Sequence, residues 1–233
     1  MKRKWVAGMV CIMVISLVMA VLLMGNTATA EETSVTAPYL YFIGHASIML
    51  ETAGGTVIYV DPSYAGDYGA PADIILITHA HDDHNKPKLV TKKPDCVTIT
   101  WKEALAGGEH QSFEVQGVTI QAVPAANKNH SIKSSVGYVL TFDGIVFYHA
   151  GDTSMLESMS ELAELEIDYA MYPVDGRYNM GVDEAVVVAG MVKAKHSIPM
   201  HFFVEGEKMA ALQAEFIPER ALYVGYGERI MVE

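Results

Sequence analysis

The strongest constraint on this chain is a largely apolar run, Ala72-Asp73-Ile74-Ile75-Leu76-Ile77, followed at once by Thr78-His79-Ala80-His81-Asp82-Asp83-His84. Such a run is typical of a buried strand, so the polar residues are expected in the loop that ends it. Imidazoles and carboxylates are metal ligands, and a loop anchored on a strand can hold them in place. Alternate residues of an extended segment face one side. We therefore expect His79 and His81 at one ion, and Asp83 and His84 at a second; the alternative is a solvated turn that is rich in histidine by chance.

Further strands and helices are expected on both sides of this motif. Hairpin signals stand at Gly54-Gly55, Gly117 and Asp143-Gly144, the last being the clearest. Strands are expected at residues 39–43, 47–52, 56–60, 97–101, 113–115, 118–123, 136–142, 145–148, 167–174 and 197–202, with short strands within 221–232. Helices are expected at residues 102–106, 155–165, 182–193 and 205–216, and a solvated helix or loop at 85–95. The pattern indicates a mixed α and β protein without fixing its architecture.

Residues 1–30 have the composition of an export signal. The chain begins with Lys2-Arg3-Lys4, carries no charge over residues 5–24, and offers Thr27-Ala28-Thr29-Ala30 as a cleavage site. The apolar stretch is also long enough to span a bilayer, so an uncleaved anchor is the alternative. We predict a signal peptide at residues 1–30 and one domain at residues 31–233, located outside the cytoplasm as a secreted, periplasmic or membrane-anchored protein. Membrane contact is expected only if the segment stays uncleaved.

The charge and the cysteines exclude several functions. Removal of residues 1–30 takes away three basic residues and moves the formal net charge from −12 to −15. An acidic surface repels phosphate backbones, so nucleic acid is not expected as a partner. One cysteine, Cys96, then remains, and it cannot form an intramolecular disulfide. Its apolar neighbours predict buried packing rather than a nucleophile.

The motif His79-x-His81-x-Asp83-His84 resembles the HxHxDH signature of the metallo-β-lactamase superfamily of dinuclear metal hydrolases. The resemblance extends over essentially the whole chain after residue 38, and is greatest to small single-domain metal-dependent hydrolases related to ascorbate-phosphate lactonases. The segments that carry it are Gly44-His45-Ala46-Ser47, Asp61-Pro62, Ala150-Gly151-Asp152-Thr153, residues 173–184 and Ile198-Pro199-Met200-His201. It implies an α+β fold, a four-layer αββα sandwich with two sheets between helices.

The resemblance also implies a set of metal ligands. The first ion would be held by His79, His81 and His130, the second by Asp83, His84 and His201, with Asp152 bridging both. From the residues alone, an exposed loop histidine is the less favoured alternative for His130, and Asp152 could equally be the N-cap of the helix expected at residues 155–165. Nitrogen and oxygen ligands suit Zn²⁺ best, with manganese and iron as alternatives.

Five other polar residues have open roles. His45 is either a structural histidine or part of the pocket wall, and Asp61 either orients a ligand histidine or forms a turn. His149 is expected in the core or behind the ligands, because adjacent strand residues face opposite ways. Arg177 either clamps an anionic substrate or pairs with a surface acid, with the latter favoured. His110 is expected to be exposed.

Two such ions would hold a shared hydroxide, since metal binding lowers the pKa of water from roughly 15.7 to about 7. The hydroxide would attack a carbonyl carbon or a phosphorus, and Asp83 could accept a proton from it. Asp152 stands where typical zinc β-lactamases carry a cysteine ligand, and the chain has no room for the insertion domain of the nuclease branch. A small ester, lactone or phosphoester is therefore the expected substrate. The alternatives are a non-catalytic extracytoplasmic metal- or ligand-binding protein and, less favoured, a redox di-iron centre.

Overall fold

The structure is a computed structural model that describes residues 37–202, 212 and 214–233. The expected signal peptide or anchor at residues 1–30 and most of the helix expected at residues 205–216 lie outside the described residues. No helix in the described part of the chain is long and apolar enough to cross a membrane.

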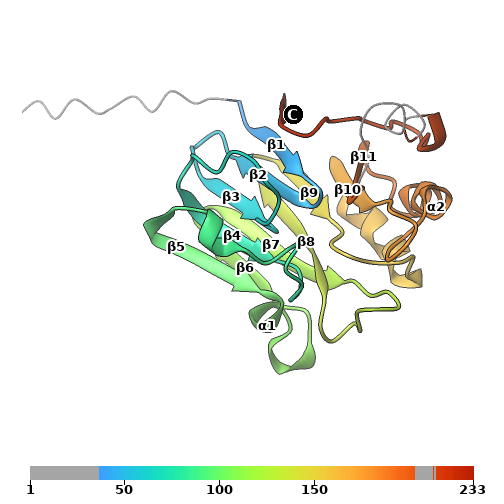
Figure 1. The fold of residues 1–233 in the computed structure, drawn as a ribbon, viewed down its shortest axis with the longest axis horizontal. Coiled ribbons are helices and arrows are strands. Elements are labelled where there is room, and N and C mark those ends of the chain that lie inside the picture. Colours follow the sequence, from blue (N-terminus) through green and yellow to red (C-terminus); the bar gives the residue numbers. More distant parts are fainter. Residues whose placement is uncertain (1–36, 203–211, 213) are drawn as a thin grey trace, which may run out of the picture. The chain divides into compact units, whose positions relative to one another are not determined.

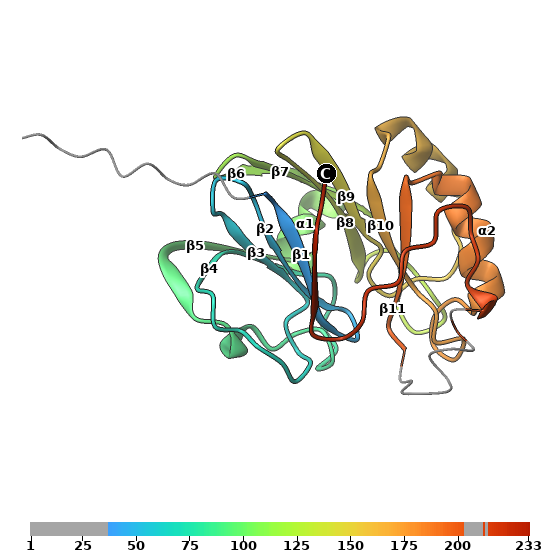
Figure 2. The ribbon, with the colours of Figure 1, turned by 90° about the horizontal axis from the view of Figure 1, so that it is seen from above.

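Two six-stranded sheets form the body of the domain (Figures 1 and 2). The first has the order β12-β1-β2-β3-β4-β5 and the second β11-β10-β9-β8-β7-β6. The strands of the first are β1 (Tyr39–Gly44), β2 (Ser47–Glu51), β3 (Val57–Val60), β4 (Ala72–Ile77), β5 (Lys92–Thr100) and β12 (Glu228–Met231). Those of the second are β6 (Ser112–Val115), β7 (Val118–Pro124), β8 (Val136–Phe142), β9 (Ile145–His149), β10 (Tyr169–Pro173) and β11 (His196–Met200).

The two sheets repeat one pairing pattern. Neighbouring strands are antiparallel except in β3-β4-β5 and β9-β10-β11, which are parallel. The three expected hairpins are present as β2-β3, β6-β7 and β8-β9. The carboxyl ends of parallel strands meet at one edge of a sheet, and this is where open sheets bind ligands.

Alternation along the strands separates two apolar faces. In β1, Leu40 and Phe42 belong to the large core between the sheets, whereas Tyr41 and Ile43 belong to a second cluster on the outer face of the first sheet. Burying each such side chain contributes about 1.5–3 kcal/mol.

Helical segments and a loop cover the outer faces. Helix α2 (Val182–Val192) packs with the 3₁₀ segment η3 (Glu157–Leu165) over the second sheet (Figure 2). Over the first sheet, Tyr68 and Ala70 of the loop at residues 61–71 and Val90 after η1 (Pro87–Leu89) cover the outer cluster. The remaining helical segments are α1 (Trp101–Ala104) and η2 (Ala106–Gly108). The predicted α+β sandwich is confirmed, with one outer layer built mainly from loop.

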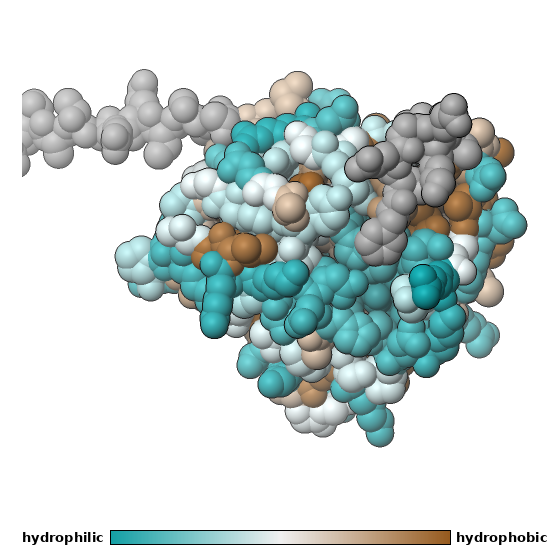
Figure 3. Space-filling model, in the orientation of Figure 1, coloured by the Kyte–Doolittle hydropathy of each residue, from teal (hydrophilic) through white to brown (hydrophobic). Residues whose placement is uncertain are grey.

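Two secondary-structure predictions were wrong in detail. Strand β5 begins at Lys92 rather than Val97, because β4 pairs with it from Ala72 and Asp73 binds Lys93 at 2.6 Å. Exposed lysines are common on edge strands, where charge discourages pairing with other chains. The helix expected at residues 155–165 is instead a run of 3₁₀ turns beginning at Glu157. The face seen in Figure 3 is largely hydrophilic, with apolar residues gathered in small patches.

Candidate metal centre

The expected ligands lie where parallel strands end. His79 follows β4, Asp152 follows β9, and His201 follows β11 directly. The two sheets also contact each other at these strand ends, where the backbone N–H of Val136 donates to the carbonyl of Thr78 at 3.1 Å. The β7–β8 loop adds His130 to the same place and the β1–β2 turn adds His45.

The first histidine group matches the set predicted for the first ion. Candidate ligand atoms of His79, His81 and His130 all lie within 4.8 Å of one another. Burial, and next the charge on His84, lower the pKa of His79 to about 3. Its imidazole is therefore neutral at physiological pH, which is the form that binds metal.

The second group contains Asp83, His84 and His201, together with His45. His45 Nε2 lies 3.4 Å from Asp83 Oδ2, and its ring centroid lies 3.7 Å from that of His201. The backbone N–H of His201 also donates to the His45 carbonyl at 2.7 Å. His45 is thus part of the cluster rather than a structural histidine elsewhere in the core.

Asp152 lies between the two groups. Its Oδ1 is 3.2 Å from both His84 Nε2 and His201 Nε2, and its Oδ2 is 3.9 Å from His79 Nε2. Burial alone would raise the pKa of Asp152, but the surrounding histidines, His84 foremost, hold it well below the ordinary value. The N-cap of η3 is Leu156 and makes no side-chain cap, so the alternative of Asp152 as a helix cap is wrong.

A fully buried carboxylate, Asp61, orients histidines of both groups. It accepts hydrogen bonds from His84 Nδ1 at 2.7 Å, Thr78 Oγ1 at 2.6 Å and the Thr78 backbone N–H at 2.8 Å. The Thr78 hydroxyl in turn lies 2.9 Å from His79 Nδ1 and accepts its proton. Asp61 also turns the chain after β3 in the left-handed region, with φ 47°. Both roles considered for Asp61 therefore hold.

His84 is buried between two carboxylates. Burial opposes its positive charge, but Asp152 and Asp61 outweigh burial and raise the pKa of His84 to about 10. In the metal-free protein this imidazole is protonated at neutral pH. A metal ion at Nε2 would replace that proton, since ligand histidines bind in the neutral form.

His149 lies outside the ligand groups, as strand alternation predicts. Its Nε2 donates to the Ala46 carbonyl at 2.9 Å, and its Nδ1 accepts from the Gly151 backbone at 3.2 Å. Gly151 has φ 63°, and a Cβ there would lie 2.7 Å from the Val136 carbonyl oxygen. Glycine is needed for the turn that brings Asp152 to the cluster.

Sequence reasoning missed three residues behind the ligands. Asp175 Oδ2 lies 3.0 Å from His201 Nδ1, and Asn127 Oδ1 lies 2.9 Å from His130 Nδ1. Asn179 bonds to both Asp175 and Asn127. Burial alone would raise the pKa of Asp175, but hydrogen bonds, that of His201 first, hold it well below the ordinary value. The position of Asp175 just after β10 was the feature of the sequence that could have identified it.

Three lesser predictions were wrong, only partly met or left open. The Arg177 guanidinium stacks 4.9 Å from the Tyr178 ring and forms no ion pair with any described residue, so the favoured pairing with a surface acid stays a prediction. His110 is half-buried rather than exposed. Cys96 is partly buried against the outer apolar cluster, which fits packing but not full burial.

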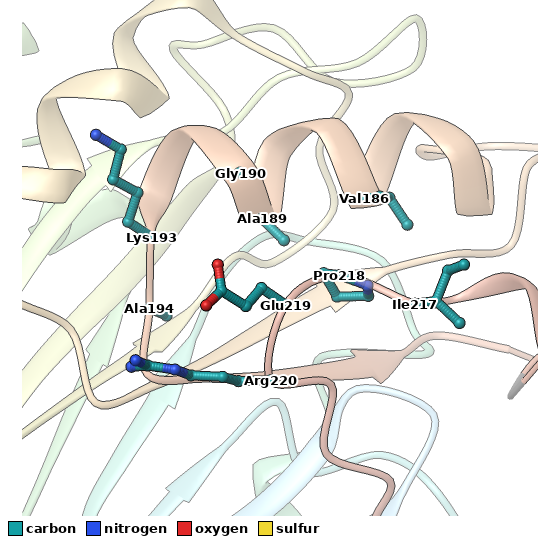
Figure 4. A pocket seen from close by; sticks show the side chains of 9 residues that line it. All are labelled: Val186, Ala189, Gly190, Lys193, Ala194, Ile217, Pro218, Glu219 and Arg220. Carbon is teal, nitrogen blue, oxygen red and sulfur yellow. The ribbon is translucent and has the colours of Figure 1, made fainter.

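A cavity of about 420 Å³ opens onto the cluster. It is lined by His81, Asp83, Asn129, His130, Asp152, Tyr178 and His201. A larger cavity of about 500 Å³ lies elsewhere, between α2 and residues 217–220 (Figure 4). Its charged residues are Lys193, Glu219 and Arg220, and its lining has no histidine or cysteine. The chemistry therefore points to the smaller cavity.

The cluster fits a metal ion. His79 Nε2 is a buried nitrogen without a hydrogen-bond partner in the described part of the chain. Such an atom calls for an explanation, and an ion is one. The ring's other nitrogen donates to Thr78, so the lone pair of Nε2 faces the cluster. The donors are imidazoles and carboxylates, which bind zinc, manganese and iron.

Residues 39–201 match the model of the β-lactamase superfamily domain. The chain belongs to this superfamily. It is 32% identical over 188 residues to a UPF0173 metal-dependent hydrolase of Pyrococcus furiosus, and 34% identical over 187 residues to one of Thermococcus onnurineus. Each match covers 69% of this chain and 83% of the relative. The chain is a metal-dependent hydrolase, as the motif predicted.

Solved structures share the hydrolase's fold. A Parabacteroides distasonis protein, provisionally assigned as a metal-dependent hydrolase, is 33% identical with a TM-score of 0.69, over 80% of this chain and 92% of that one. Igni18, a metallo hydrolase of Ignicoccus hospitalis, is 21% identical with a TM-score of 0.66, over 85% and 99%. The latter likeness supports the fold alone.

Proposed function

We propose that this hydrolase is dinuclear and cleaves a small ester, lactone or phosphoester. The observation that carries the proposal is Asp152, whose two oxygens face different ligand groups. The first ion would be held by His79, His81 and His130, the second by Asp83, His84 and His201, with Asp152 between them. Zinc is the ion that we favour for these donors, with manganese and iron as alternatives.

When bound, the two ions would activate water as a nucleophile and polarise the bond that it attacks. The chain's own residues prepare the site for this chemistry. Asp61 accepts the Nδ1 proton of His84, and Thr78 accepts that of His79, so that both Nε2 atoms face the cluster as the nitrogens available to an ion. Asp83 lines the cavity with a half-exposed side chain, where it can accept a proton from the nucleophile.

The cavity supports a small-molecule substrate. Its volume of about 420 Å³ lies in the range usual for small-molecule sites. The polar histidines and aspartates that line it suit a substrate with a polar reacting group. The names of the relatives as metal-dependent hydrolases favour an enzyme over the non-catalytic binding protein.

Elemental analysis and turnover test the proposal together. After metal-replete expression we expect two transition-metal ions per chain, and turnover of a model ester, lactone or phosphodiester that chelation abolishes. Asp152→Ala should lose bound metal and turnover, whereas His149→Ala should keep two ions, because both ring nitrogens of His149 bond to backbone groups. One ion or none in the wild type, or a folded Asp152→Ala with two ions and normal turnover, would contradict the proposal.

We also propose export, on the basis of Lys2-Arg3-Lys4, the uncharged stretch and Thr27-Ala28-Thr29-Ala30. N-terminal sequencing of native material should find Glu31 as the first residue. Intact Met1 in the membrane fraction would favour the anchor, and intact Met1 in soluble cytoplasm would contradict export.

A further inference from the structure

A chain of hydrogen bonds that ends in a close contact between Asp175 and His201 joins the two ligand groups from behind. His130 Nδ1 lies 2.9 Å from Asn127 Oδ1, and Asn127 Nδ2 donates to Asn179 Oδ1 at 2.6 Å. Asn179 Nδ2 then donates to Asp175 Oδ2 at 2.8 Å, and this oxygen lies 3.0 Å from His201 Nδ1. His130 of one predicted metal site therefore lies at one end of this series of contacts, and His201 of the other site lies at the opposite end.

The orientation of the first amide is determined by its backbone contacts. Asn127 Oδ1 accepts the backbone N–H groups of Asn129 and His130, at 2.8 and 2.9 Å. The oxygen therefore stays on the His130 side, and the amide nitrogen must face Asn179. Because Asn179 presents its oxygen to that nitrogen, its own NH₂ group faces Asp175 and donates there.

The carboxylate at the other end is held equally firmly. Asp175 Oδ1 accepts the backbone N–H groups of Arg177, Tyr178 and Asn179, at 2.8, 2.6 and 3.3 Å. This leaves Oδ2 for the Asn179 side chain and for His201. Because Asp175 Oδ2 lies 3.0 Å from His201 Nδ1, the opposite nitrogen of that ring, Nε2, faces the cluster, 3.2 Å from Asp152 Oδ1.

We propose that Asn179 is a positioning residue for both metal sites, although its side-chain hydrogen bonds go to Asn127 and Asp175 and not to a candidate ligand. This inference rests on the proposed dinuclear site. Asn179 is 8% exposed, so water has little access to replace its bonds. Asn179 provides the acceptor that fixes the Asn127 amide nitrogen and a donor that fixes Asp175. Groups behind the ligands of a metal site typically change metal affinity about 10- to 100-fold when they are replaced.

Two substitutions separate the two bonds of Asn179. Asn179→Ala removes both bonds, so both sites should bind metal about 10-fold more weakly or worse. Asn179→Asp keeps an acceptor for Asn127 but places a carboxylate against Asp175. The site that contains His201 should then weaken more than the site that contains His130.

The test is a Zn²⁺ titration of chelator-stripped full-length protein against a chromophoric competitor, which yields the stoichiometry and both affinities. The free energy of unfolding of each metal-free variant is measured in parallel. Arg177→Ala is the matched control, because this residue is in the same loop and its exposed side chain stacks on Tyr178 rather than on any residue of the hydrogen-bond chain. We expect wild-type affinities for it.

Each outcome decides the inference. A folded Asn179→Ala that binds two ions with wild-type affinities, or that weakens only one site, overturns it while the dinuclear proposal stands. Fewer than two ions in the wild type overturns both. If Asn179→Ala does not fold, Asn179→Asp decides, because it has nearly the same volume: unchanged affinities, or an equal loss at both sites, would refute the positioning role.

Discussion

The substitution Asp61→Asn tests whether a buried carboxylate organises the metal centre. Asp61 Oδ2 accepts from His84 Nδ1 and Thr78 Oγ1, and Oδ1 accepts from the Thr78 backbone N–H. Asparagine has one acceptor oxygen, so its NH₂ group must face one of these donors. The left-handed backbone at Asp61, with φ 47°, is one that asparagine adopts readily, so the change adds no backbone strain.

Two effects determine how far Asp61→Asn lowers the free energy of unfolding of the metal-free protein. A buried N–H left without its acceptor costs about 1–3 kcal/mol. Removing one charge from the buried pair with protonated His84 costs about 3–5 kcal/mol when no other partner remains. Because Asp152 still faces His84 at 3.2 Å, part of the second cost is offset. We expect the free energy of unfolding at pH 7 to fall by about 3–5 kcal/mol in total.

Urea unfolding of the metal-free protein measures this loss, and a Zn²⁺ titration measures the accompanying fall in affinity, expected at about 10- to 100-fold. The matched control is Asp73→Asn. Asp73 is a buried aspartate of the same sheet that accepts from the Val57 backbone and from the partly exposed Lys93. Its ion pair should contribute about 0–1 kcal/mol, and metal affinity should not change. Equal losses in the two variants, or an unchanged Zn²⁺ affinity in Asp61→Asn, would refute the reasoning.

Two further predictions concern stability. The neighbouring carboxylates raise the pKa of His84 from 6.5 to about 10 against the effect of burial, so the stability that it contributes is complete below pH 6.5 and is lost as pH rises through 10. The free energy of unfolding of the metal-free protein should fall over this range, and His84→Gln should remove most of the slope; equal slopes would contradict this. Gly151→Ala should cost clearly more than Gly117→Ala, since both residues have positive φ but only at Gly151 would a Cβ meet backbone, 2.7 Å away. Urea unfolding of both variants checks this, and equal losses would show that the close approach is tolerated.

Local sequence determined the hairpins and the histidine motif of the candidate site. Asp143-Gly144 forms its turn through backbone preferences of two residues, so the β8–β9 hairpin needs no distant partner. The histidine motif likewise depends on the strand just before it. The family resemblance, rather than composition or periodicity, supplied the αββα architecture and the grouping of His130 and His201 with that motif.

Tertiary structure decided what local patterns leave open. The polar residues after Lys92 form part of a strand because they lie beside β4. The sequence around residue 92 gives no indication of that pairing. The bond between Asn127 and Asn179 joins residues 52 positions apart. Such contacts depend on where two loops are placed by the sheets, and a single asparagine in a polar loop carries no sign of its partner. The candidate ligands could be named because they lie in the histidine motif or match the family resemblance, whereas Asn127, Asp175 and Asn179, which lie behind them, meet only after the sheets have packed.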